Sequence, residues 1–97
     1  MGRELEVPAA VFEASEFDEV LRVWIGSDAV VAIRDIFGAD VHNWGMVLAD
    51  VAMHIAKMKL ERDGISEIET LHALEDGYRG RMSEQFNIQH RSLTGRN

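Results

Sequence analysis

The stretch from Trp44 to Ala56 constrains the fold of this chain most, because its pattern is that of an amphipathic helix. Apolar side chains recur there at the three- and four-residue intervals of one helical face: Trp44, Val47, Leu48, Val51, Ala52 and Ile55. Asp50 and His54 fall on the opposite stripe, together with Lys57 and Glu61. We therefore expect a helix over residues 40–63 that buries its aliphatic flank and leaves its Asp–His flank in water.

The ends of this helix and the start of a second one are also marked. Asp40 is the predicted N-cap, and Gly64 is the predicted stop because glycine adopts the left-handed conformation readily. Ser66 and Glu69 then have the spacing of a capping box. The second helix is expected over residues 66–86, with an apolar stripe of Ile68, Leu71, Leu74, Tyr78 and Met82. The short link makes the two helices antiparallel neighbours.

Residues 17–36 are compatible with two structures. Leu21, Val23 and Ile25 alternate as in a strand, residues 26–28 supply turn chemistry, and residues 29–33 form a β-branched run. The same segment also fits a helix capped by Ser15 and ended at Gly26. We favour a β-hairpin near residues 19–34, and therefore an α+β fold; the alternative is an all-α, three-helix fold.

The length of 97 residues predicts a single domain over 1–97 with one modest core. Residues 1–16 are expected to be a loosely held N-terminal arm, and residues 87–97 a frayed tail. Two strands alone are marginal in water, and an open strand edge favours pairing. We therefore expect a homodimer that completes the hairpin, joined through the hairpin edge or the helix faces. The predicted interface residues are Trp24, Trp44 and Tyr78.

The charge balance argues against a nucleic-acid surface, since 17 acidic residues face 10 basic ones and the net charge is −7. A weaker alternative is an auxiliary contact through the late arginines Arg79, Arg81, Arg91 and Arg96. The chain has no cysteine, so thiol chemistry is excluded. Neither a signal peptide nor a membrane helix is expected, and the predicted location is the cytoplasm.

Several short motifs resemble a small alphaproteobacterial family that is a domain of unknown function. They are Arg22-Val23-Trp24-Ile25, Trp44-Gly45, Leu48-Ala49-Asp50, His54-Ile55-Ala56 and Glu75-Asp76-Gly77-Tyr78, and the likeness spans about residues 19–82. The resemblance implies short stand-alone proteins without established activity, and the order strand, strand, helix, helix. At residues 79–81, Arg-Gly-Arg stands where acidic and apolar residues are expected, so a shared surface there is in doubt.

Two pairs of side chains could form a catalytic or metal-binding site: Asp50 with His54, and His72 with Asp76. Each pair is four residues apart, so its members share a helix face, and a carboxylate with an imidazole can hold a divalent metal or exchange a proton. If the helices turned both pairs toward each other, a four-ligand cluster would form. The simpler interpretation is a solvated face with an Asp–His contact.

The sequence therefore favours a non-enzymatic interaction or ligand-binding module that acts as a homodimer without a cofactor. Its acidic surface favours a basic or mixed protein partner, whose identity the sequence does not give. No nucleic-acid or membrane partner is expected. The alternative from a different class is a divalent-metal-binding protein that uses Asp50, His54, His72 and Asp76.

Overall fold

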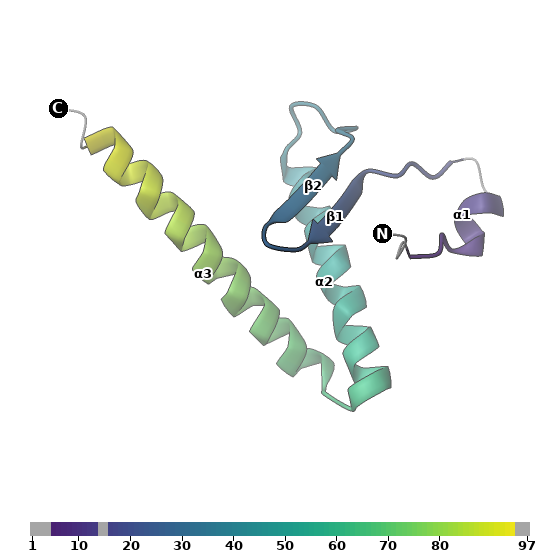
Figure 1. Cartoon of the computed structure of the whole chain (residues 1–97). Helices are drawn as coiled ribbons and strands as arrows, with labels where there is room; N and C mark the ends of the chain where they lie inside the picture. The colour runs from purple at the N-terminus through teal and green to yellow at the C-terminus, as the bar shows by residue number, and fades with distance from the viewer. Residues whose placement is uncertain (1–4, 14–15, 95–97) are drawn as a thin grey trace. The chain divides into compact units, whose positions relative to one another are not determined.

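The computed structural model describes residues 5–13 and 16–94. The elements follow one another as α1 (Ala9–Glu13), β1 (Leu21–Ile25), β2 (Ala29–Ile33), α2 (His42–Asp63) and α3 (Glu67–Thr94) (Figure 1). A hairpin followed by two long helices confirms the predicted α+β class. The chain divides into two compact units, Met1–Ala39 and Asp40–Asn97.

The hairpin is an antiparallel pair in which Val23 lies opposite Val31. Its two ends are closed by backbone hydrogen bonds, from the Gly26 N–H to the Asp28 carbonyl (3.0 Å) and from the Arg34 N–H to the Val20 carbonyl (2.9 Å). The helical alternative for residues 17–25 is therefore wrong, and the three-helix fold with it. The run of residues 29–33 favours this outcome, because its branched side chains prefer a strand and it supplies residues 21–25 with a strand to pair with.

The side chains of the hairpin divide between two faces, since alternate residues of a strand point to opposite sides. Directly paired residues share a face. One of these, the aliphatic face, consists of Leu21, Val23, Ile25, Ala29, Val31 and Ile33. The other carries Arg22, Trp24, Val30 and Ala32. Both faces are largely apolar, which is unusual for a sheet that packs on one side and meets water on the other.

The first unit also contains α1, a helix of five residues within the arm expected to be loosely held. The Val11 N–H donates to the Pro8 carbonyl at its start (3.0 Å). Leu5 and Phe12 are 94% and 78% exposed. Within this unit, therefore, these apolar side chains of the arm do not form a core with the hairpin.

Helix α2 begins slightly later than predicted. Its N-cap is Val41, which makes no side-chain capping bond, so the prediction of Asp40 as the cap is wrong. Instead the Asp40 carboxylate accepts a hydrogen bond from the Asn43 side-chain amide (2.9 Å), and the Asp40 carbonyl accepts one from the Asn43 N–H (3.1 Å). Asp40 therefore stabilises the turn that leads into the helix.

The predicted end of α2 is confirmed. Gly64 has a φ of 71° and donates its N–H to the Leu60 carbonyl (3.1 Å), which is the left-handed helix stop that glycine favours. Arg62 lies in the last turn, where a positive charge interacts well with the helix dipole.

Helix α3 starts as predicted and ends later. The Ser66 hydroxyl accepts a hydrogen bond from the Glu69 N–H (3.2 Å), which confirms the hydroxyl half of the capping box. The expected end near Phe86 is wrong, because the helix continues to Thr94. No glycine or proline stands between Gly80 and Gly95, so nothing in the sequence interrupts the backbone hydrogen bonds. Of the expected tail, residues 87–94 are helical and 95–97 lie outside the described residues.

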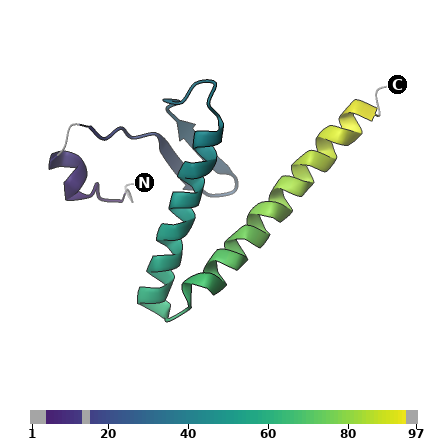
Figure 2. The same ribbon diagram turned by 180° about the vertical axis from the view of Figure 1, so that it is seen from behind.

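The two helices of the second unit are joined at residues 64–66 and spread apart away from this turn (Figures 1 and 2). Among the described residues, the buried ones are Ala56, which is 1% exposed, and Thr70, which is 9% exposed. Both lie within about two helical turns of the link. No helix in the described ranges is long and apolar enough to cross a membrane.

Candidate functional site

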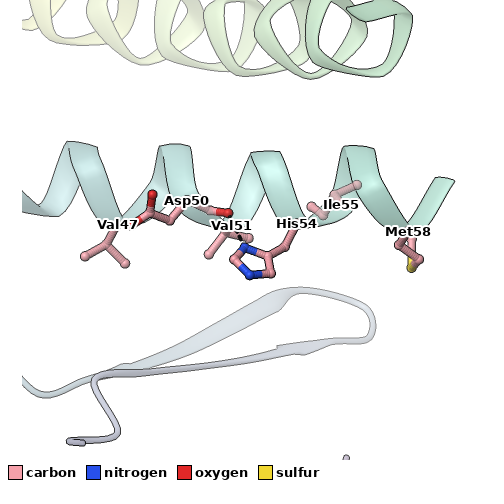
Figure 3. Close-up of a pocket in the computed structure, with 6 residues that line it drawn as sticks. All are labelled: Val47, Asp50, Val51, His54, Ile55 and Met58. Atoms are coloured by element: carbon pink, nitrogen blue, oxygen red, sulfur yellow. Dashed lines mark hydrogen bonds between the residues drawn. The ribbon is translucent and has the colours of Figure 1, made fainter. Parts of the chain in front are cut away.

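Asp50 and His54 come together on α2, but through the backbone. His54 donates from Nδ1 to the backbone carbonyl oxygen of Asp50 over 2.8 Å (Figure 3). A carbonyl oxygen can only accept, so Nδ1 is the donor in this bond and Nε2 takes no part in it. The expected contact between the imidazole and the Asp50 carboxylate is therefore replaced by a bond within the helix itself.

The surroundings of this pair differ from the expected solvated stripe. A shallow hollow on α2 is lined by Val47, Asp50, Val51, His54, Ile55 and Met58, all on one side of the helix (Figure 3). Val51 was expected inside, yet it is 43% exposed. Ala56, outside the predicted stripe, is the buried residue instead. The small side chain of Ala56 allows α2 and α3 to approach each other closely near the turn. Larger aliphatic side chains of α2, such as Val51, stay exposed.

The second predicted pair does not join the first. The part of the chain that the structure describes contains no group of three or more His, Cys, Asp and Glu residues placed to hold a metal ion. His72 and Asp76 lie on α3, where both are exposed. Asp50, His54, His72 and Asp76 therefore make two separate pairs, and a metal would have at most two of these ligands at a time.

The three predicted interface residues lie on three different elements. Trp24 is on β1 and is 47% exposed, while Trp44 is half-buried in the first turn of α2. Tyr78 is on α3 and is 58% exposed. It lines a second shallow hollow with Glu75, Arg79, Met82, Ser83 and Phe86. Sequence analysis missed Phe86 in this set, although Tyr78, Met82 and Phe86 are spaced at four residues and share a helix face.

The aliphatic face of the hairpin is an exposed apolar surface that sequence analysis did not single out. Val23 and Val31 are 52% and 50% exposed, and Ile25 is 79% exposed. Among the described elements of this unit, β1 and β2 contact each other, and no other helix or strand packs on these side chains. The alternation of residues 21–25 and the run of residues 29–33 were the available signals, because paired strands place them on one surface.

Two of the exposed ion pairs lower the pKa of a carboxyl group. The Arg22 guanidinium donates to both carboxylate oxygens of Glu19 (2.6 and 3.1 Å), and this hydrogen bonding lowers the pKa of Glu19. On α2, the Lys59 ammonium lies 2.5 Å from the Asp63 carboxylate and lowers the pKa of Asp63. Both pairs are exposed, so they make weak contributions to stability that salt screens.

Comparison with solved structures shows that the fold of this chain occurs in another protein. Among the solved structures, the chain is similar to a protein of Rhodopseudomonas palustrus CGA009, described as a "putative pyruvate dehydrogenase from the photosynthetic bacterium". The TM-score is 0.66 at 24% identity, over 86% of this chain and 85% of that one. At this identity the likeness establishes a common fold. Among curated proteins, none matches this chain.

The sequence itself identifies the family. Residues 4–86 match the family described as "Domain of unknown function (DUF5076)". This match covers both strands, α2 and most of α3. It includes every motif on which the resemblance rested. The chain therefore belongs to the DUF5076 family of domains of unknown function.

Proposed function

We propose that this protein is a non-enzymatic interaction module that acts as a homodimer in the cytoplasm. The observation that carries the proposal is the scarcity of buried residues: among the described ones, Ala56 and Thr70 alone are buried. A stable domain of this size needs a larger apolar core than one alanine and one threonine provide. In the proposed dimer, a second copy of the chain buries apolar side chains that are exposed in the single chain.

The distribution of the exposed apolar residues supports association. They lie on both units, on the aliphatic face of the hairpin, on the hollow of α2 and on the Tyr78–Phe86 side of α3. Large apolar patches of this kind mark surfaces that bind other proteins. Closed two-fold dimers are the commonest way in which small chains bury such surfaces.

The charge of the chain favours a protein partner over a nucleic acid. A net charge of −7 repels phosphates, whereas a basic or mixed protein surface is attracted to it. Arg79 and Arg81 pair with Glu75 and Glu84 on α3 (2.9 and 3.3 Å). Carboxylates thus offset the charge of two of the late arginines.

The two hollows of this chain are poorly suited to an enzyme site. Enzyme sites for small substrates are usually concave and enclosed by several elements. The two hollows described above are each lined by residues of a single helix and are open to solvent. An interaction surface fits this geometry better than a site that must exclude water from a reaction.

Thermal unfolding at several protein concentrations tests the proposal. If folding is coupled to dimerisation, the midpoint temperature rises with concentration, because mass action favours the associated native state. A rise of several degrees across a hundredfold range of concentration is expected. A midpoint that does not change over this range would show that the monomer folds alone, and would overturn the proposal.

A further inference from the structure

We propose that the free edge of β2 pairs with β2 of a second copy, antiparallel and in a register centred on Val31. This inference rests on the proposed homodimer and names the surface that forms it. Within the described residues, the sheet contains β1 and β2 alone, so the outer edge of β2 has no strand beside it. The outcome would be a four-stranded sheet in the order β1, β2, β2 of the partner and β1 of the partner.

The backbone hydrogen bonds at the two ends of the hairpin identify which groups of β2 point outward. In an antiparallel pair, residues that exchange hydrogen bonds alternate with residues that do not. The bonds between Gly26 and Asp28 and between Arg34 and Val20 fix this alternation. Arg22 with Ala32 and Trp24 with Val30 are therefore the inward-bonding pairs. The N–H and carbonyl groups of Ala29, Val31 and Ile33 consequently face the open edge.

The edge of β2 also lacks the devices that keep strands from pairing. Its sequence, Ala-Val-Val-Ala-Ile, contains no charge, proline or glycine. Such residues normally protect an exposed edge strand. By contrast, β1 carries Arg22, whose guanidinium is paired with Glu19. Of the two edges of the hairpin, that of β2 is the one suited to association.

A second copy fits this edge because the strand is complementary to itself. In the register centred on Val31, Ala29 pairs with the partner's Ile33, and Val31 with the partner's Val31. The same register places Asp28 beside the partner's Arg34 at each end of the strand pair. Asp28 and Arg34 are exposed, and neither forms an ion pair within 4.0 Å among the described residues. Arg34 interacts electrostatically with Glu19 of the same unit, whose main partner is Arg22.

Neighbouring registers lose this charge complementarity. The bonding pattern allows shifts by two residues, which would set Asp28 opposite the partner's Ala32 or the partner's Ile36. They would also shorten the overlap of the strands. In the proposed register, the residues at positions 28 and 34 occupy a non-hydrogen-bonded pair, where side chains of opposite strands approach most closely. The pairing of Asp28 with Arg34 and the length of the strand overlap therefore both favour the register centred on Val31.

Pairing at this edge would also stabilise the hairpin. A two-stranded sheet is at best marginal in water, and three or more strands are needed for independent stability. The four-stranded sheet would join the aliphatic faces of both copies into one continuous apolar surface. It would satisfy the outward backbone groups of β2 at the same time.

Single-cysteine variants of the full chain test the edge, because the natural chain has no cysteine. Val31→Cys should form an intermolecular disulfide under mild oxidation, since the two Cα atoms would lie about 5.5 Å apart. Val23→Cys is the matched control. It lies on the same face, directly opposite Val31 and with similar exposure (52% against 50%), but on β1. Across three strand spacings, its Cα atoms would be about 15 Å apart, beyond disulfide reach.

Charge reversal tests the register. Asp28→Arg or Arg34→Asp alone should raise the dimer dissociation constant about tenfold, because each sets like charges opposite each other at both ends. The double variant should return it to within about twofold. Asp18→Arg makes the same charge change on the same unit, away from β2, and should leave the dissociation constant unchanged.

The outcomes separate this inference from the proposed function. A dimer that links through Val31→Cys and not through Val23→Cys, with rescue in the double charge variant, is the expected result. A dimer that links through Val23→Cys, or through neither thiol, would overturn the β2 edge and leave the homodimer standing. Failure of the double variant to rescue would overturn the register. A monomer at all concentrations would overturn both proposals.

Discussion

His54 donates its Nδ1 proton to the backbone carbonyl of Asp50, one helical turn earlier, over 2.8 Å. The bond engages one of the two ring nitrogens and leaves the Asp50 carboxylate uninvolved. An acid–base pair needs the imidazole to meet the carboxylate, and a metal site needs more ligands than this pair offers. The relationship therefore makes His54 a side chain that is held by its own helix.

Added zinc or manganese should not stabilise the protein. The described residues bring no third ligand to Asp50 and His54, so binding would be too weak to favour the native state. The measurement is the thermal midpoint of protein prepared without a histidine tag, with and without one equivalent of metal. A rise of several degrees that disappears in His54→Ala would contradict this prediction.

Gly64→Ala should destabilise the protein by about 1 kcal/mol, because Gly64 has a φ of 71° and a side chain is strained in that conformation. Gly77→Ala is the matched control within α3. A Cβ there meets nothing within 4 Å, so the substitution should stabilise by about 0.5–1 kcal/mol. Denaturant unfolding measures both. Effects of the same sign would show that backbone conformation does not separate the two glycines.

Ser66→Ala should cost about 1 kcal/mol, since it removes the hydroxyl that accepts the Glu69 N–H at the start of α3. Ser66→Asp keeps an acceptor in place and should retain most of the stability. Ser83→Ala, in the exposed interior of the same helix, should change the free energy of unfolding by less than about 0.5 kcal/mol. Equal losses at Ser66 and Ser83 would argue against capping.

Lys59→Gln should raise the pKa of Asp63 toward that of an ordinary aspartate, because the hydrogen bond from Lys59 is the main cause of its lowered pKa. A carboxylate whose pKa is lowered by folding stabilises the native state above its unfolded pKa. This contribution is lost as the pH falls through the folded pKa, and hence at acidic pH. Titration followed by NMR measures the pKa directly. Lys57→Gln, two residues away, is the control, and an equal rise there would refute the assignment.

Local patterns predicted the hairpin, the Gly64 stop and the Ser66 hydroxyl cap from the sequence. Each depends on residues that are close along the chain. Alternation in residues 21–25 and a β-branched run after a short turn favour a hairpin over the helix that the first of these segments also fits. Gly64 and Ser66 act through their own backbone geometry. These features do not require knowledge of what the helices pack against.

The packing of α2 was not predictable in the same way. An apolar stripe defines a broad face, but the part of it that touches α3 depends on side-chain size. Ala56 allows the backbones to approach near the turn, whereas Val51 on the predicted stripe stays exposed. The hydrogen bond between His54 and the Asp50 carbonyl was not predictable either. A spacing of four residues allows the imidazole to bond with the Asp50 carboxylate or with the Asp50 backbone carbonyl.

Sedimentation equilibrium of the full chain tests the central claim most directly. The chain has a mass of 10.9 kDa. At micromolar concentrations, a homodimer that covers the exposed apolar faces predicts a species of twice this mass, which dissociates on dilution with loss of secondary structure. A species of one chain mass that keeps its helices and hairpin at every concentration would contradict the account.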